Sequence, residues 1–163
     1  RHMPRTVIQG QLAPFTYCVH GRALRGSTYM PSVRLVRRGR TRLYQDGHTE
    51  RVAVEGRTLS LRNPLLHDDR KPLERFLASQ SRYMRLEADT LMNGARTPPR
   101  LVDRLRRSRF FAPFVVLGYC LFVKRLVFDG LPGIFYAFQR ALAELTLSLY
   151  LIDDELKRRE RAR

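Results

Sequence analysis

A histidine and a carboxylate, His48 and Glu50, lie two residues apart just after an Asp46-Gly47 turn signal. Side chains two apart on an extended strand point to the same side. A carboxylate beside an imidazole is a reasonable general base for a hydroxyl nucleophile. The same spacing more often marks an exposed polar strand edge. Glu50 and His48 are therefore candidates for proton transfer, with the exposed edge as the alternative.

A second group of reactive side chains, His67-Asp68-Asp69, follows the apolar residues 64–66. Histidine with aspartate can bind a divalent metal or orient a diphosphate. Either aspartate could instead be the N-cap of the helix expected next, and we favour that role for both. For His67 we favour a place in the site.

Three arginines lie in or next to the first basic strand: Arg34, Arg37 and Arg38. The planar guanidinium fork suits phosphate oxygens. Alternation puts Arg34 on the side opposite Arg37, so the three cannot all face one ligand. For Arg38, Arg40 and Arg42 a solvated face is the preferred interpretation.

A helix predicted over Lys71–Met92 must support these residues, because its apolar side chains recur at i, i+3, i+4 and i+7. Gln80 and Glu87 fall on the same stripe, seven residues apart. Buried polar groups cost desolvation unless they are paired. We expect both to hydrogen-bond to the strands or to the arginines, with partial exposure as the alternative. Asn93-Gly94 is typical of a helix end.

Before this helix the chain is rich in β-branched residues and turn signals. The expected strands are Phe15–Val19, Val33–Arg37, Thr41–Tyr44, Arg51–Glu55 and Thr58–Leu61. The last two predict a hairpin joined near Gly56. The fold class expected is α+β, a small and mostly antiparallel β-region followed by amphipathic and apolar helices. Its parts are residues 1–70, a packing helix in 71–95, and helices with a charged tail in 96–163.

The charge balance points to an anionic partner. The 163 residues contain 31 Lys and Arg against 15 Asp and Glu, a net charge of +16. Nucleic acid, a nucleotide diphosphate or an anionic lipid surface would fit, and so would a solvated basic surface with no specific ligand. Cys18 and Cys120 have neither disulfide-framework nor metal-ligand spacing, which favours a reducing compartment.

The most apolar stretch, residues 110–128, contains the fourteen residues of Phe110–Val123, which Pro113 interrupts and Lys124-Arg125 follows. A membrane span needs about 20 mostly apolar residues. We favour a helix that lies in the interface of an anionic bilayer, because phenylalanines are edged by arginines here. A buried core helix and a true span are the alternatives. A further long helix is expected over Ile134–Ile152.

Several of these features, taken in order, resemble the C-terminal half of bacterial family 2 glycosyltransferases of the lipopolysaccharide-core and cell-envelope type. The features are Pro31-x-x-Arg34-Leu-Val-Arg-Arg38, Gly47-His-Thr-Glu50, Gly56, His67-Asp-Asp-Arg-Lys71, Gln80-x-x-Tyr83-x-x-x-Glu87-Ala88, the phenylalanine-rich segment, Asp129-Gly130-x-x-Gly133 and Gln139-Arg140. The resemblance runs from about Gly21 to Ile152, which is most of the chain.

The resemblance implies a GT-A architecture and an inverting transfer from a nucleotide sugar to a lipid-linked or saccharide acceptor. It makes Glu50 the base, with His48 beside it. It makes Arg34, Arg37 and His67 candidates for binding the diphosphate or its metal, which would be Mg²⁺ or Mn²⁺ in the full-length enzyme. The expected location is cytoplasmic, peripheral on the inner face of the bacterial plasma membrane. No nucleic acid partner is expected.

One departure from the family's pattern bears on activity. The nucleotide-binding half, a βαβ region that ends in an Asp-x-Asp metal motif, should precede Tyr29, and no such pattern is found there. We expect this chain to be part of a longer protein and to lack turnover by itself. The competing interpretations are a non-enzymatic basic module that binds anionic membrane or nucleic acid, and a small integral membrane protein.

Overall fold

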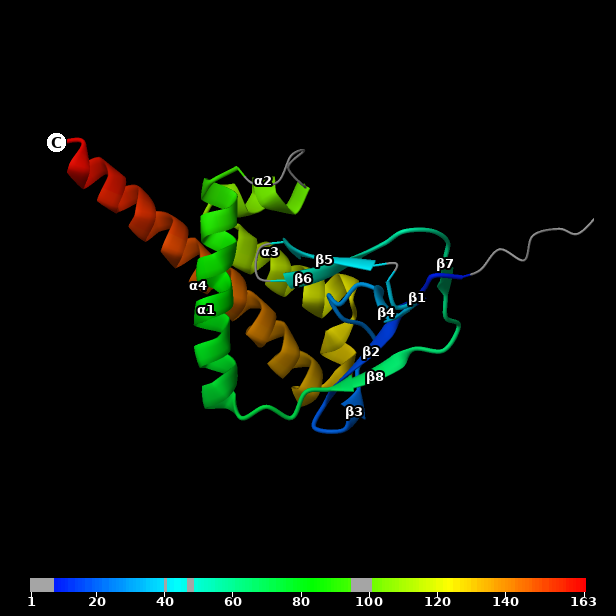
Figure 1. Ribbon diagram of the computed structural model, residues 1–163. Helices are drawn as coiled ribbons and strands as arrows, with labels where there is room; N and C mark the ends of the chain where they lie inside the picture. Colours follow the sequence, from blue (N-terminus) through cyan, green and yellow to red (C-terminus); the bar gives the residue numbers. More distant parts are fainter. Residues whose placement is uncertain (1–7, 40, 47–48, 95–100) are drawn as a thin grey trace, which may run out of the picture.

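The fold is α+β, with small sheets at one end and a layer of helices at the other (Figure 1). The computed structural model describes residues 8–39, 41–46, 49–94 and 101–163, and for residues 46, 49 and 50 it describes the backbone alone. This confirms the fold class predicted from the sequence.

The strands of the described residues form three small sheets, two of three strands and one of two. Their orders are β4-β1-β7, β3-β2-β8 and β5-β6. Antiparallel pairing joins β1 to β4, β2 to β3 and β5 to β6, whereas β1 runs parallel to β7 and β2 parallel to β8. The strand bounds are β1 Gly10–Ala13, β2 Phe15–Val19, β3 Arg22–Ala23, β4 Ser32–Val36, β5 Thr41–Asp46, β6 Thr49–Val54, β7 Thr58–Ser60 and β8 Leu65–Asp68.

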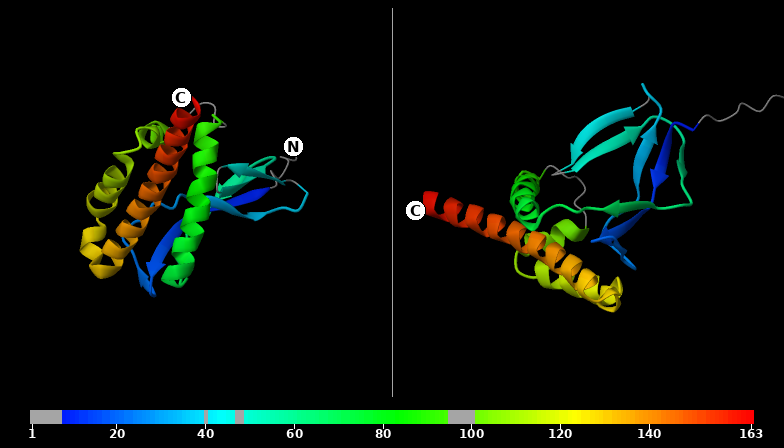
Figure 2. Two further views of the ribbon diagram at one scale, coloured as in Figure 1. Left: turned by 90° about the vertical axis from the view of Figure 1, so that its left-hand side faces the viewer. Right: turned by 90° about the horizontal axis from the view of Figure 1, so that it is seen from below.

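The helical layer is built around the last helix, which α3 and α1 flank on opposite sides (Figure 2). Its elements are α1 Leu73–Met92, α2 Leu101–Arg107, α3 Ala112–Gly118, the π-helical turn η1 Tyr119–Val123, the 3₁₀ turn η2 Leu126–Asp129 and α4 Leu131–Arg161. None of the helices in the described ranges is long and apolar enough to cross a membrane.

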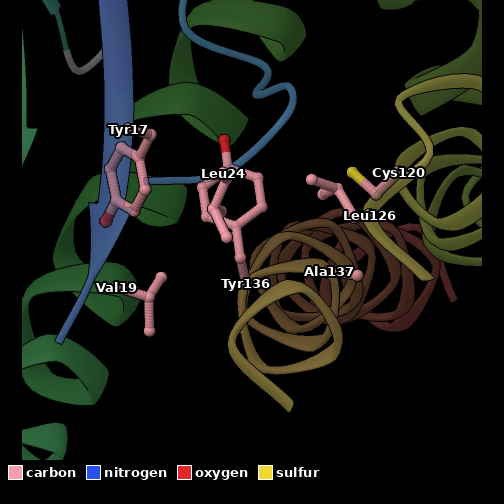
Figure 3. Close-up of a cluster of buried hydrophobic side chains, with 7 residues drawn as sticks. All are labelled: Tyr17, Val19, Leu24, Cys120, Leu126, Tyr136 and Ala137. Atoms are coloured by element: carbon pink, nitrogen blue, oxygen red, sulfur yellow. The ribbon is translucent and has the colours of Figure 1, made fainter. Parts of the chain in front are cut away.

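Two cores hold the layer together. One joins β2 to the start of α4 and contains Tyr17, Val19, Leu24, Cys120, Leu126, Tyr136 and Ala137 (Figure 3). The other lies between α1 and the middle of α4 and contains Met84, Ala88, Leu91, Ala143, Leu147 and Leu151. Gly133 allows α4 to start close to η2, because a Cβ there would overlap the carbonyl of Leu126.

The hairpin predicted around Gly56 is wrong. β7 does not pair with β6 but lies parallel to β1, with Gly10 opposite Thr58. Gly56 has a φ of 127° and packs against the side chain of Gln9. The backbone N–H of Gln9 donates to the carbonyl of Arg57. The chain therefore crosses to the first sheet at Gly56 instead of turning back on itself.

The N-cap prediction for Asp68 and Asp69 is also wrong. Strand β8 continues through Asp68, whose carboxylate accepts from the backbone N–H of Gly21 at 3.2 Å and from Nε of Arg70 at 2.7 Å. Asp69 pairs with Lys71 at 3.6 Å. Helix α1 begins after Pro72, with no side-chain cap. The parallel pairing with β2 keeps the chain extended through Asp68.

Candidate functional site

The pair predicted to transfer a proton lies outside the described residues. This holds for the whole of His48 and for the side chain of Glu50, whose backbone is part of β6 opposite Gln45. The two strands on either side of the predicted turn do pair, with Asp46 opposite Thr49. The role of Glu50 and His48 therefore stays a prediction.

His67 lies in the middle of a group of rings that we call the aromatic cluster: Phe15, Tyr17, Tyr29, His67 and Tyr136. Its ring centroid is 5.1 Å from that of Tyr29, 5.2 Å from that of Tyr17 and 6.3 Å from that of Phe15. Tyr17 stacks on Tyr29 at 5.1 Å and meets Tyr136 at 4.7 Å. Segments far apart in the sequence thus meet at one imidazole.

The sheet explains why these rings meet. Residues two apart on a strand share a face, so Phe15 and Tyr17 of β2 point the same way. His67 lies directly opposite Tyr17 on the parallel strand β8, so its ring joins that face. Tyr136 reaches the cluster from α4, and its hydroxyl oxygen accepts from the backbone N–H of Thr28 at 2.9 Å. Figure 3 shows Tyr17 and Tyr136 on the two elements that the cluster bridges.

The exposure of the rings decides which of them a ligand could touch. Tyr17 and Tyr136 are buried, and His67 and Phe15 are partly exposed. Tyr29 is 42% exposed, although one of its faces is covered by Tyr17. Tyr29 and His67 are therefore the residues of the cluster that, with Phe15, remain partly open to solvent above the buried Tyr17 and Tyr136.

Two guanidinium groups accompany the cluster. Arg34 of β4 lies over the ring of Phe15, with its Cζ 5.0 Å from the ring centroid, which is a cation–π distance. Arg140 follows Tyr136 by one turn on α4 and lowers the pKa of both Tyr17 and Tyr29 through its charge. The Nε of Arg140 is buried and has no hydrogen-bond partner among the described residues. A buried N–H of this kind is costly unless something accepts from it.

Burial sets the protonation state of the tyrosines. It raises the pKa of the Tyr17 phenol well above its ordinary value. It also raises the pKa of Tyr29, against the opposing charge of Arg140. Both phenols are therefore neutral near pH 7. They can donate and accept hydrogen bonds but cannot serve as bases.

The other predicted binding arginine is not part of the cluster. Arg37 is exposed just past the end of β4, where its backbone N–H donates to the carbonyl of Gln9 at 2.9 Å. The pairing of β4 with β1 has a bulge at Arg34, and Arg37 lies beyond the last residue of β4, so the predicted alternation does not relate the two side chains. The structure thus brings together His67 and Arg34 and leaves Arg37 apart from them.

Glu87 belongs to a second polar group, the buried charge network of Glu87, Asp103, Arg106 and Glu144. Arg106 of α2 donates from Nη1 to Glu87 of α1 at 2.8 Å. It also binds Glu144 of α4 through Nε at 2.9 Å and Nη2 at 2.6 Å. The carboxylates are almost fully buried, with 1% exposure for Glu87 and 3% for Glu144. The network therefore ties three helices together.

The charges of the network support one another. Burial alone would lower the pKa of Arg106, but the bonds to Glu144 and the charges of Glu87 and Asp103 raise it above its usual value. Glu87 thus finds an arginine partner on α2 rather than on the strands. Gln80, the other polar residue of the α1 stripe, is partly exposed.

The described residues do not fit a metal site at His67. Mg²⁺ takes oxygen ligands, chiefly carboxylates, phosphates and water, whereas the neighbours of His67 are aromatic rings. The carboxylate of Asp68 is held by Gly21 and Arg70. In the ranges that the structure describes, no group of three or more His, Cys, Asp or Glu side chains is placed to hold an ion. We therefore derive no step through a metal.

Comparison of the chain with protein-family models, with curated proteins and with solved structures gives no match. The residues of the chain are therefore the basis for proposing a function.

Sequence reasoning missed most of the aromatic cluster. The alternation of Phe15 and Tyr17 within one predicted strand could have indicated a shared aromatic face. The spacing of Tyr136 and Arg140, four apart on a helix, could have indicated that they lie on one side of it. Nothing local could have indicated that β2, β8 and α4 meet, because their contacts join residues more than 45 positions apart.

Proposed function

We propose that the chain is the acceptor-side and diphosphate-side part of an inverting glycosyltransferase, which acts with a nucleotide-binding half to transfer a sugar to a cell-envelope acceptor. The observation that carries the proposal is the aromatic cluster flanked by Arg34 and Arg140. The ordered resemblance to family 2 glycosyltransferases supports it independently.

The chemistry of the cluster suits a sugar joined to phosphate. A sugar ring has an apolar C–H face and a rim of hydroxyls, and a tyrosine offers an apolar ring with a polar tip. Neutral phenols and an imidazole can exchange hydrogen bonds with hydroxyls. Guanidinium groups receive phosphate oxygens through paired N–H donors. Arg140, which is partly exposed, supplies a second guanidinium beside the cluster.

In the proposed reaction Glu50 accepts the proton of the acceptor hydroxyl, and His48 assists it. The acceptor oxygen attacks the anomeric carbon of the donor sugar. The bond from that carbon to the diphosphate breaks, and the diphosphate leaves with the electron pair. Arg34 offsets the charge of the diphosphate beside His67, which is an electrostatic contribution of the usual kind.

Glucose 1-phosphate is a suitable probe of the cluster, because it joins a sugar to phosphate through the anomeric carbon as a donor does. We expect saturation transfer from the protein to its ring protons, and weaker transfer to glucose alone. Tyr29→Ala should reduce the affinity at least about fivefold. Tyr44→Ala is the matched control, because Tyr44 is 50% exposed on β5 in another sheet. Equal binding by both variants would contradict the proposal.

Turnover tests the second part of the proposal. The chain alone, incubated with uridine diphosphate sugars and Mg²⁺ or Mn²⁺, should neither hydrolyse the donor nor transfer its sugar. Clear turnover would show that no separate nucleotide-binding half is needed. It would leave the role of the aromatic cluster to be judged by the binding assay.

The second candidate function is a non-enzymatic basic module that binds an anionic surface. Its support is the net charge of +16 together with many exposed arginines. Titration of duplex DNA at increasing salt tests for a nucleic acid partner, whose affinity should fall steeply with salt. Tight binding to DNA with no binding of glucose 1-phosphate would favour this second function.

A further inference from the structure

The outward side of α3 and η1 is entirely apolar. Its exposed residues recur at helical spacing: Phe111, Phe114, Val115, Tyr119, Phe122 and Val123. Phe114 is 74% exposed and Phe122 is 71% exposed. The inward side of the same helical segment packs into the first core through Cys120, Val116 and Leu117. In this segment the phenylalanines are thus left in solvent, while the smaller side chains of Cys120, Val116 and Leu117 pack against the core.

Helix α4 also leaves a row of apolar side chains exposed, over a longer distance. Its exposed apolar residues are three or four apart: Leu131, Phe135, Phe138, Leu142, Leu145 and Leu149. The buried side of α4 mixes the small residues Gly133, Ala137 and Ala143 with larger ones, Tyr136, Leu147 and Leu151. A stripe of this kind normally faces a core.

Among the described residues, the arrangement of the helices leaves this side of α4 without a cover. α3 and α1 flank α4, and β2 contacts it (Figure 2). The remaining side carries the leucine and phenylalanine stripe. Together with α3, η1 and the exposed Val127 and Phe128 of η2, this stripe forms what we call the apolar face. Exposed apolar patches of this extent mark interaction sites.

From residue 110 to residue 142 the exposed charges beside the apolar face are basic, whereas its far end lies one turn before Asp153, which pairs with Lys157. Residues 110–142 contain a single acidic residue, Asp129. Asp129 is buried and accepts from the backbone N–H of Arg25 at 2.9 Å and from its Nε at 3.1 Å. The cations Lys124 and Arg125 lie between η1 and η2, at the turn that joins the exposed segments. An apolar surface with a basic rim complements anionic headgroups.

We propose that the apolar face docks on an anionic lipid bilayer, with α3 and α4 lying in the plane of its headgroup region. A second copy of the chain is a poorer occupant, because two faces with the same basic rim would repel each other. Phenylalanine and leucine are also the side chains that interfacial helices bury at the boundary between headgroups and acyl chains. The proposal does not depend on sugar transfer, because the apolar face contains none of the exposed residues of the aromatic cluster.

The chain lacks tryptophan, so single introduced tryptophans report their own surroundings. Phe122→Trp and Phe138→Trp place a reporter on the apolar face, and Leu43→Trp places one on β5, where Leu43 is exposed. Vesicles of phosphatidylcholine with phosphatidylglycerol should shift the emission of the first two to the blue. Brominated lipids should quench both of them but not Leu43→Trp. Quenching of all three alike, or of none, would overturn the proposal.

Affinity gives a second test. Cosedimentation with the same vesicles should fall at least about tenfold for the triple variant Phe114→Ser, Phe122→Ser, Phe128→Ser. The matched triple variant Leu35→Ser, Leu43→Ser, Leu66→Ser should bind as the original chain does, because these residues are exposed on the strands. Binding should be weaker to pure phosphatidylcholine and should persist in part at high salt, because burial of apolar surface is not screened.

Two outcomes would overturn the proposal in favour of another partner. Complete loss of vesicle binding at high salt would indicate a purely electrostatic contact. A lipid-free dimer that the phenylalanine triple variant abolishes would assign the apolar face to a second copy. Neither outcome affects the binding of glucose 1-phosphate, so the two proposals can fail separately.

Discussion

The aromatic cluster and the buried charge network both place polar groups against α4, but they treat those groups differently. In the network, Arg106 is saturated by Glu87 and Glu144, and no buried atom of these side chains lacks a partner. In the cluster, the Nε of Arg140 is buried without a partner in the described part of the chain, and Tyr29 is half-exposed. A fully paired group holds structure together, whereas Arg140 is partly exposed and keeps unused donor capacity beside an open surface.

Arg106→Ala should produce the largest effect, because it leaves Glu87 and Glu144 buried without their cation. Removing one partner of a buried ion pair costs about 3–5 kcal/mol. Urea denaturation should show this loss in the free energy of unfolding. Lys157→Ala is the control, since Lys157 pairs with Asp153 on the surface of α4 and should change stability by no more than about 0.5 kcal/mol. A loss below about 1 kcal/mol for Arg106→Ala would mean that the network does not hold the helices together.

Arg140→Met should separate binding from stability. Methionine keeps the apolar stem but removes the partnerless Nε, so the free energy of unfolding should rise by about 1 kcal/mol, because a buried N–H without an acceptor is costly. The affinity for glucose 1-phosphate should fall about tenfold, because a guanidinium donor to phosphate is lost. A destabilisation as large as that of Arg106→Ala would erase the difference between the two regions.

Alkaline pH should destabilise the protein through Tyr17. Its pKa is raised on folding, so the native state keeps the phenol proton when the unfolded chain has lost it. The stabilisation is complete below the ordinary tyrosine pKa of about 10 and is lost as the pH rises above that value. Each pH unit in this window should cost up to about 1.4 kcal/mol for this group. Tyr17→Phe should flatten the dependence, and an unchanged slope would show that the Tyr17 phenol is not buried in solution.

Tyr29→Phe should have the smallest effect. It keeps the stacked ring and removes only the hydroxyl, so the free energy of unfolding should change by no more than about 1 kcal/mol. The affinity for glucose 1-phosphate should fall about threefold or less, the value of one neutral hydrogen bond. A loss equal to that of Tyr29→Ala would assign the binding to the hydroxyl rather than to the ring, and titration by ligand-observed NMR distinguishes the two.

The candidate site was only partly predictable. His67 and Arg34 could be chosen from their residue types alone. His67 lies in the aromatic cluster, and Arg34 lies over its Phe15 ring. Arg140 and Tyr136 were not singled out as site residues, because a helical residue near an apolar stretch is more often part of a core. Their role depends on the packing of α4 against β2, which joins residues more than 100 positions apart.

Local pattern by itself determined the two long helices and several strands, but not β1, β3 or β8. Phe15–Val19 forms β2, and the helix predicted at 71–92 is α1. Helix α4 begins and ends beyond its predicted bounds. Its charged end stays helical to Arg161, helped by the i, i+4 pairs Lys157–Asp153 and Arg159–Glu155. Periodicity and punctuation act within a few residues, so they are visible in the sequence.

Tertiary structure alone decided which neighbour each element took. It sent β7 to β1 instead of β6, and it paired Glu87 with Arg106. It also turned the apolar stripe of α4 outward, because the small residues on the other side, such as Ala137 and Ala143, let α3 and α1 approach closely. An apolar stripe predicts that a face must be covered, but only packing decides whether the protein covers it.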